Sequence, residues 1–567
     1  MRKQSAWLMF ALSMVVFFVG LIFPLILVIR NGFVNPDGQF TLRYLIGVFQ
    51  NPIYLEGLRN SLRLAIGTTL TATLFSLPLA WLSNRYSFIG KGAVNALVLV
   101  PMILPPFVGA IGFQQILGQY GSLNALFGLE VDCLGQGRWV GVIILQSLSL
   151  YPIMYLNISA ALANIDHAMD EAAENLGATG FTKFRRITLP LMTPGLFAGG
   201  TIVFIWSFTE LGTPLIMNYT RVASVQVFDA LKDIGGNPFP FALVVVMLAV
   251  SVTLYALSKV FFGGKAYAMQ SKAATTFKET RLTGIKGLLA LLPFVLVITL
   301  ALLPHLGVIL TSFTKPGGWY QTVLPTVFTT ENYVEALGHT MTVRSIRNSL
   351  MFSSMAVFFN LILGIGIAFV VVRSNIKVRG LLDALAMMPL AVPGLVMATG
   401  YLAFSSYLAN EVFRDNETLQ GIFDVRTNPT VFLVMAYGIR RLPYMVRSAV
   451  AGLQQTSAGL EEAAANLGAP PLVSLRRVTL PLITANLIAG ALLAFAFSML
   501  EVSDSLMLAQ REDFYPITKT IYELFQLIGT GKYIASALGV WAMVFLAVTI
   551  VGSSLILGKK MGALFRV

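Results

Sequence analysis

The sequence predicts an all-α integral membrane protein, with about 12 transmembrane helices arranged as two parallel six-helix repeats. The composition, the spacing of the apolar segments and a polar stretch that occurs twice lead to this prediction. Hydrophobic residues make up 56% of the 567 residues and charged residues only 11%, whereas a soluble domain has about 25% charged residues. So little charge cannot cover a folded surface in water, so the apolar segments are expected to face lipid.

Twelve apolar windows follow one another along the chain, each long enough for a spanning helix of about 20 residues. The first six fall at 7–29, 61–83, 93–118, 139–163, 193–217 and 240–262, and the second six at 286–312, 349–372, 381–408, 429–452, 483–508 and 535–557. We interpret the first window as a retained span, because it is long for a signal peptide and lacks a clear cleavage site.

The basic residues predict the orientation. If the N-terminus is cytoplasmic, the inner segments hold 22 of the 39 lysines and arginines, at about twice the density of the outer loops. Twelve spans then place both termini in the cytoplasm. The net charge of +13 is thus a topology signal, which argues against a nucleic-acid partner. The single cysteine, Cys133, excludes an intramolecular disulfide framework.

The chain contains an internal repeat. Residues 170–191 and 461–482 are identical at 13 of 22 positions, 291 residues apart. Asn60-Ser61-Leu62 matches Asn348-Ser349-Leu350 at an offset of 288. Six spans per half put both halves the same way up, related by an axis along the membrane normal. The predicted units are a first half at 1–262, a cytoplasmic linker at 263–285 and a second half at 286–567.

Each copy of the polar stretch is expected to form a helical elbow on the cytoplasmic side, between the fourth and fifth spans of its half. These loops are 165–190 and 456–481. Glutamate and alanine favour a short helix at its start. Gly177 and Gly468 suit the helix end, and prolines such as Pro190 suit the first turn of the next span.

The spacing is Glu-Ala-Ala, three residues, Gly, nine residues, Ile or Val, one residue, Leu-Pro. It resembles the EAA loop of permease subunits of binding-protein-dependent ABC importers of the type I fold, with Val478 in place of the usual isoleucine. The resemblance implies a bacterial inner-membrane protein whose elbows dock on two copies of a cytoplasmic ABC ATPase, with an extracytoplasmic solute-binding protein as a further partner beside membrane lipid. The implied coupling residues are Glu171, Ala172, Ala173, Gly177, Glu462, Ala463, Ala464 and Gly468.

No Walker A loop, G-x-x-x-x-G-K-[ST], occurs in the chain. The chain is therefore expected not to be an enzyme, and ATP and Mg would be bound by the partner ATPase. No cofactor or metal site is expected in this chain itself. A secondary transporter is a remote alternative, because it would need an ion-coupling site and no ATPase elbow.

Polar residues inside membrane spans are functional candidates by default. The candidates for the translocation path are Glu210, Glu501, Arg440, Arg441, Ser207 and Ser498. Two interpretations of the arginines stay open. They either line the path and attract an anionic solute, or pair with Glu501 or Asp504 and fix the packing.

Two permease halves fused over about 550 residues resemble the ferric-iron permease family, as do the segments "RRLPY" and "ELGTPLI" (210–216). The resemblance implies ferric iron as the solute. The alternatives are 2-aminoethylphosphonate or another small anion, and thiamine. Unpaired arginines in the path would suit an anionic ferric complex or a phosphonate better than the thiamine cation.

Overall fold

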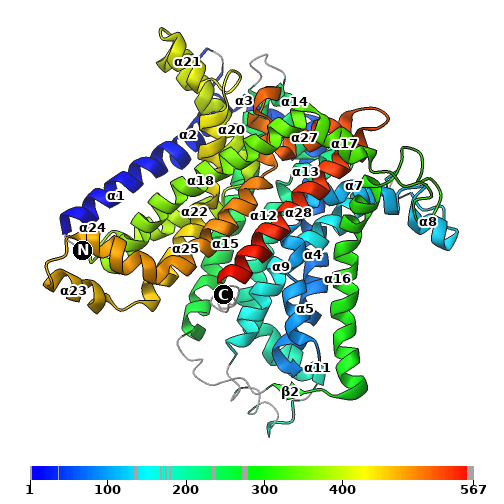
Figure 1. The fold of residues 1–567 in the computed structure, drawn as a ribbon, viewed down its shortest axis with the longest axis horizontal. Helices are drawn as coiled ribbons and strands as arrows, with labels where there is room; N and C mark the ends of the chain where they lie inside the picture. Colours follow the sequence, from blue (N-terminus) through cyan, green and yellow to red (C-terminus); the bar gives the residue numbers. More distant parts are fainter. Residues whose placement is uncertain are drawn as a thin grey trace.

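The structure is a computed structural model that describes residues 3–35, 37–132, 134, 135, 137–165, 169, 172, 175–178, 180–232, 238–270 and 279–557. Cys133, residues 271–278 of the expected linker and the last ten residues lie outside the described part. Helices dominate the fold, as the composition predicts, and Figure 1 shows them packed into one bundle.

The first half begins with a span whose two α-helices are joined by a π-helical turn. Its elements are α1 (Lys3–Phe17), η1 (Phe18–Ile22), α2 (Phe23–Phe33), α3 (Arg43–Gln50), α4 (Pro52–Arg85), β1 (Tyr86–Ser87), α5 (Lys91–Leu97), α6 (Val100–Ile103), α7 (Pro106–Leu117), α8 (Ser122–Phe127), α9 (Arg138–Ala163), α11 (Gly180–Lys183), η2 (Phe184–Thr188), α12 (Leu189–Phe208), α13 (Gly212–Ile216), α14 (Ala223–Lys232) and α15 (Phe239–Gln270). α15 continues past residue 262, the expected end of this half.

From β2, in the expected linker, onward, the second half repeats this order of helices. Its elements are β2 (Thr280–Arg281), α16 (Gly284–Ser312), α17 (Glu331–Gly338), α18 (Thr340–Arg373), α19 (Arg379–Met387), η3 (Met388–Leu390), α20 (Gly394–Tyr407), η4 (Leu408–Val412), α21 (Glu417–Phe423), α22 (Thr430–Gln455), α23 (Ala458–Asn466), α24 (Pro471–Ser474), η5 (Leu475–Thr479), α25 (Leu480–Met499), α26 (Ser503–Leu508), η6 (Glu512–Phe514), α27 (Ile517–Gln526) and α28 (Gly531–Leu557).

Within the described residues, nine helices are long and apolar enough to cross a membrane, and two bent helix pairs raise the number to 11. The bent pair at 379–412 turns by 100° near Pro393, which lacks a backbone N–H and stands directly before α20. α22 occupies the tenth expected position, but it carries three arginines, at 440, 441 and 447. Together these helices account for all twelve apolar windows.

The fifth and eleventh spans differ from the expectation of continuous helices over 193–217 and 483–508. Each breaks near its end: α12 ends at Phe208 before α13, and α25 ends at Met499 before α26. Each also begins earlier than expected, because a short helix and a π-helical turn precede the α-helix. Apolar residues continue beyond the charged residue at each break, so the windows appeared continuous in the sequence.

The first span of each half packs on the other half. α2 lies along α20 of the second half, and α16 lies along α7 of the first half. Glycine allows both crossings. A Cβ at Gly112 would come within 2.1 Å of the carbonyl oxygen of Pro304, and one at Gly400 would meet Pro24 at 3.1 Å. The hydroxyl of Tyr401 also donates to the Gly20 carbonyl in η1 at 2.7 Å. The two halves are therefore interlocked.

The chain returns to the first half before its seventh span begins. β2 pairs in parallel with β1, so that Tyr86 lies opposite Thr280. Lys91 and Glu279 form an ion pair of 2.7 Å beside these strands. These contacts lead α16 onto the first half, where it packs against α7.

Two ends of the bundle can be distinguished in Figure 1. We call the end that carries α11 and α23 the elbow end. We call the opposite end, which carries α14 and α27, the far end.

Candidate functional site

The second polar stretch forms the helical elbow that its sequence predicts. α23 begins after Ser457, whose hydroxyl accepts a hydrogen bond from the amide of Gly459 at 3.2 Å. Gly468 follows the helix with a φ of +82°, in the left-handed region that favours glycine. The amide of Ala469 then bonds back to the carbonyl of Ala464 at 3.0 Å and closes the helix end.

The first elbow repeats the turn. Gly177 has a φ of +80°, and the amide of Leu176 bonds to the carbonyl of Ala172 at 3.1 Å. Glu171 and Ala173 lie outside the described residues, so their roles stay predictions. The equal backbone angles confirm that both glycines serve the same turn.

Two consecutive glutamates in the second elbow have different environments. Glu461 is partly buried, and its Oε1 accepts hydrogen bonds from Nε of Arg373 at 3.2 Å and from the hydroxyl of Thr479 at 3.3 Å. Arg373 also donates to the carbonyl of Thr456 at 2.8 Å. Glu461 therefore fixes the elbow to the end of α18. Glu462 is exposed, as is the neighbouring Ala463, so both are open to a partner.

Each elbow also exposes two large apolar side chains. Leu176 and Leu467 are 88% and 89% exposed, and Phe181 and Leu472 are 74% and 77% exposed. The members of each pair are 291 residues apart, which is the repeat offset. A repeated apolar patch outside the apolar windows indicates a protein contact. Sequence reasoning missed these residues, although a large apolar residue inside a polar stretch was the available signal.

At the far end, the first-half break lies at Glu210. Oε2 of this residue accepts a hydrogen bond from the amide of Thr213 at 2.9 Å, which caps the first turn of α13. One turn earlier, the hydroxyl of Ser207 donates to Oε1 of Gln146 on α9 at 2.6 Å. Within the described part of the chain, Glu210 has no ion-pair partner.

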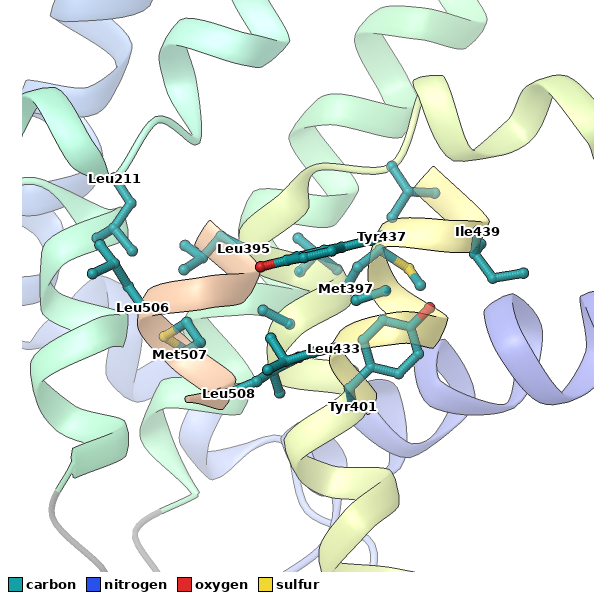
Figure 2. Close-up of a cluster of buried hydrophobic side chains, with 14 of the residues drawn as sticks. Leu211, Leu395, Met397, Tyr401, Leu433, Tyr437, Ile439, Leu506, Met507 and Leu508 are labelled. Carbon is teal, nitrogen blue, oxygen red and sulfur yellow. The ribbon is translucent and has the colours of Figure 1, made fainter. Parts of the chain in front are cut away.

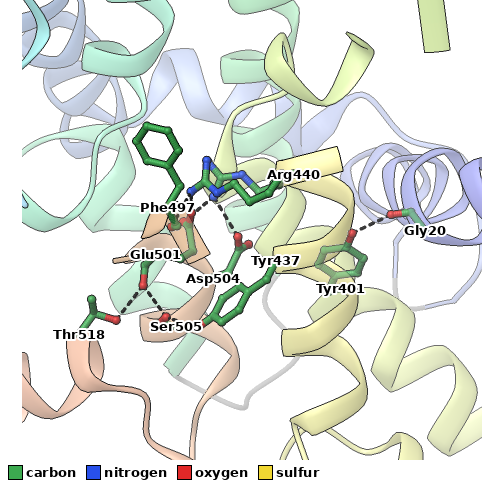
Figure 3. A network of polar contacts seen from close by, with 10 residues as sticks. Gly20, Tyr401, Tyr437, Arg440, Phe497, Glu501, Asp504, Ser505 and Thr518 are labelled. Atoms are coloured by element: carbon green, nitrogen blue, oxygen red, sulfur yellow. Dashed lines mark hydrogen bonds and ion pairs between the residues drawn. The ribbon is translucent and has the colours of Figure 1, made fainter. Parts of the chain in front are cut away.

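At the second-half break, two acids meet two arginines of α22, and we call these four residues the charge quartet: Arg440, Arg441, Glu501 and Asp504. Figure 3 labels Arg440, Glu501 and Asp504. Arg440 bonds to Glu501 and, at 2.9 Å, to Oδ2 of Asp504. Arg441 bonds to the other oxygen of Glu501 and to the Phe497 carbonyl at 3.2 Å. The quartet is charge-balanced and largely buried. Of the two interpretations left open by the sequence, the structure has the ion-paired one.

The two path serines are placed alike but bonded differently. Ser207 and Ser498 both lie one turn before the break and are both buried. Unlike Ser207, the hydroxyl of Ser498 has no hydrogen-bond partner within the described part of the chain.

The repeated Asn-Ser pair holds the short helices at the far end in place. Ser61 accepts a hydrogen bond from the amide of Ala223 at 3.0 Å, and Ser349 accepts one from Ile517 at 2.7 Å. These bonds fix the starts of α14 and α27 to α4 and α18. Sequence comparison found the pair but not this purpose.

The adjacent asparagines complete this contact, which we call the Asn-Ser clamp. Asn60 donates to the carbonyl of Arg221 at 2.8 Å, and Asn348 donates to the carbonyls of Asp513 and Tyr515 at 2.8 and 3.2 Å. Both halves therefore bond the segment before the short helix in the same way.

The two breaks meet between the halves. A Cβ at Gly212 would come within 2.9 Å of Cγ1 of Val502, and Figure 2 shows Leu211 beside Leu506. Nearby, the rings of Phe228 on α14 and Tyr522 on α27 meet edge to face, 6.1 Å apart. Phe228 and Tyr522 are equivalent in the two halves. Apolar contacts therefore join equivalent elements across the interface.

Two interlocked six-span halves, with an elbow on each at the same end, are the architecture of a membrane permease. The chain belongs to the family described as binding-protein-dependent transport system inner membrane component, which matches residues 72–266 and 360–558. These two matches begin 288 residues apart, which is the offset of the Asn-Ser pair and close to the 291 residues that separate the elbows. The family confirms the fused two-half ABC importer permease that the elbow motif predicted.

Named relatives match both halves together. The ferric transport system permease protein FbpB of Actinobacillus pleuropneumoniae is 26% identical over 81% of this chain and 64% of its own length. The Fe(3+)-transport system permease protein FbpB 2 of Haemophilus influenzae is 24% identical over 81% of this chain and 82% of its own. The sulfate transport system permease protein CysT of Escherichia coli K12 is 28% identical but covers only 36% of this chain.

Proposed function

We propose that this permease forms the translocation path for ferric iron, delivered by an extracytoplasmic binding protein and driven by two copies of a cytoplasmic ATPase. The observation that supports iron most strongly is the length of the match. Relatives named for ferric transport match about four fifths of the chain, across both halves, whereas the sulfate relative matches 36% of the chain.

The charge quartet removes the argument from unpaired arginines, which applied to an anionic ferric complex as well as to a phosphonate. Both arginines bond to carboxylates, so the preference for iron depends on the length of the match and not on the quartet. An anion would have to displace Glu501 from Arg440 and Arg441. The quartet also offers a thiamine cation no unpaired carboxylate, because both of its acids bond to arginine.

The elbows support the ATPase partner. Each presents exposed leucine next to the turn at Gly177 or Gly468, and Glu462 lies open beside one of them. An exposed apolar anchor flanked by charge is typical of a docking surface. Two elbows at one end would bind two ATPase copies. Because the ATPase is cytoplasmic, we assign the elbow end to the cytoplasm, together with both termini.

The path itself is assigned to the interface where the two breaks meet. Leu211 and Gly212 contact second-half residues there, and the path candidates Glu210 and Glu501 lie at the two breaks. Because apolar side chains fill the contact, we take this as the closed outer gate. Opening it requires the breaks to separate.

The test uses proteoliposomes that hold this permease with its ATPase and binding protein. We expect uptake of radiolabelled ferric iron only when ATP and the binding protein are both present. Labelled sulfate, 2-aminoethylphosphonate and thiamine should not accumulate. Uptake of one of these in place of iron would overturn the substrate, and uptake driven by an ion gradient without the ATPase would overturn the ABC mechanism.

A further inference from the structure

We propose that Arg440 and Arg441 are positioning residues that lock the second-half gate segment, α26, so that the outer gate opens by movement of the first-half segment, α13. This inference rests on the proposed path between the two breaks. It does not depend on iron as the solute.

Arg440 joins three parts of the second half. Its guanidinium bonds to Glu501 at the break and to Asp504 in α26 (Figure 3). The same group lies against Gly394 at the bend of the ninth span, where a Cβ would come within 2.4 Å of Nη1. Gly394 is therefore needed to admit the arginine. Break, gate segment and bend are held by one side chain.

Two further contacts tie α22 to the same region. The hydroxyl of Tyr437 lies 2.6 Å from Oγ of Ser505 in α26, and Arg441 bonds to Glu501. Glu501 is only 5% exposed and Asp504 is fully buried. Moving α26 away from α22 would leave both carboxylates without their cations in a low-dielectric environment, which is unfavourable. We therefore expect these elements to move as one body.

The first half keeps the equivalent glutamate, Glu210, but lacks the side chains that bond to Glu501 and to α26 in the second half. Ser149 and Leu150 replace the two arginines, Thr213 replaces Asp504, and Pro214 replaces Ser505. Tyr437 corresponds to Gln146, which bonds to Ser207 before the break and not to the gate segment.

Hydrogen bonds without an arginine hold α13 instead. Oε2 of Glu210 accepts the amide of Thr213 within the same turn of the chain, and Nε2 of Gln114 on α7 donates to the carbonyl of Ile216. Neither bond joins α13 to a charged side chain on another helix, and the net contribution of a single hydrogen bond is small. The first-half segment is therefore the one that is free to move.

The experiment uses one reporter position in each half. Leu215 and Leu506 are equivalent by the repeat and are 5% and 2% exposed. Each is changed to cysteine in a Cys133→Ser background, in the full complex with ATPase and binding protein. The rate of labelling by a water-soluble thiol reagent is compared at rest and after vanadate trapping with ATP. We expect at least a tenfold rise for Leu215→Cys and less than a twofold change for Leu506→Cys.

The lock is then removed without leaving a net charge. Arg440→Gln combined with Asp504→Asn keeps the Arg441–Glu501 pair, and should raise trapped-state labelling of Leu506→Cys toward that of Leu215→Cys. In a matched control, Arg440→Lys with Asp504 unchanged, Leu506→Cys should keep most of its protection from labelling. Equal labelling of the two reporters in the unmodified complex would overturn the proposal, as would a protected Leu506→Cys in the double variant. If the double variant fails to assemble, the comparison of the reporters still decides.

These outcomes separate the lock from the proposed function. Labelling that depends on ATP but occurs without iron uptake would leave the lock intact and reject iron. Iron uptake with an equal rise in labelling at both reporters would support iron as the solute and reject the lock.

Discussion

The breaks in the fifth and eleventh spans have the same backbone contacts but different side-chain chemistry. In both halves a hydroxyl from the short helix at the far end reaches the glutamate's carbonyl: Ser224 to Glu210 and Thr518 to Glu501, each at 2.7 Å. Both halves also use the Asn-Ser clamp. Only the second half adds the charge quartet. The shared contacts build the repeated fold. The charge quartet, which the first half lacks, can serve a step in which the two halves act differently.

A second difference lies where the first span of each half packs on the other half, at the crossings of α16 with α7 and of α2 with α20. At Gly112 the backbone of α16 approaches so closely that no side chain fits, whereas a Cβ at Gly400 would make a tight contact of 3.1 Å with Pro24 that a small shift could relieve. The two halves therefore share a topology without sharing the same tolerance at each contact.

The largest expected effect comes from making one substitution at the two equivalent glutamates. Glu501→Gln leaves two buried arginines with one carboxylate, which should cost about 3–5 kcal/mol of permease stability. Glu210→Gln keeps an oxygen that accepts the Thr213 amide, so the loss should be about 1 kcal/mol. Thermal unfolding of the two purified variants in detergent measures the difference. Equal losses would show that the quartet is not what separates the halves.

Next in size is the pair of crossing glycines. Gly112→Ala places a methyl group against the backbone at Pro304 and should cost about 3 kcal/mol, at the upper end for an overpacked contact. Gly400→Ala needs a shift of only a few tenths of an ångström and should cost less than about 1 kcal/mol. The same unfolding assay compares them. A larger loss at Gly400 would contradict the close approach of α16 and α7.

The Asn-Ser clamp should give smaller and more similar effects. Asn348→Ala removes two hydrogen bonds and Asn60→Ala removes one. We expect losses of about 2 and 1 kcal/mol, because each net hydrogen bond contributes about 1 kcal/mol. Unfolding midpoints check the order. No loss at either position would mean that the clamp does not hold the short helices.

The smallest effect on permease stability should come from the exposed elbow leucines. Leu176→Ala and Leu467→Ala should leave the unfolding midpoint unchanged, because both side chains already face solvent. Each should weaken ATPase binding by about tenfold, through the loss of apolar area that the complex buries. Binding of the ATPase to the permease in nanodiscs measures this. Unchanged affinity in the double variant would reject the docking assignment.

Much of the architecture could be predicted from the sequence. The repeat at 170–191 and 461–482, its two glycines and the twelve apolar windows were all visible as local patterns. Such patterns can be recognised because they depend on local backbone geometry, such as the left-handed turn at Gly177 and Gly468.

Contacts between distant segments could not be predicted in this way. A membrane helix is apolar on every side, so its sequence does not say which neighbour it packs against, and the exchange of α2 and α16 stayed hidden. The break at Glu210 was hidden because apolar residues continue beyond it. Pairing of Arg440 with Glu501 was one of two open interpretations, and only the relative placement of α22 and α25 decided between them.

The most direct test of the account is the composition of the assembled complex. Native mass spectrometry should show one copy of this 61.6 kDa chain with two ATPase subunits. Changing one elbow leucine to aspartate, as Leu467→Asp, should leave one ATPase bound, and adding Leu176→Asp should leave none. A complex with a single ATPase, two copies of this chain, or full ATPase occupancy in the double variant would contradict two equivalent docking elbows on one fused permease.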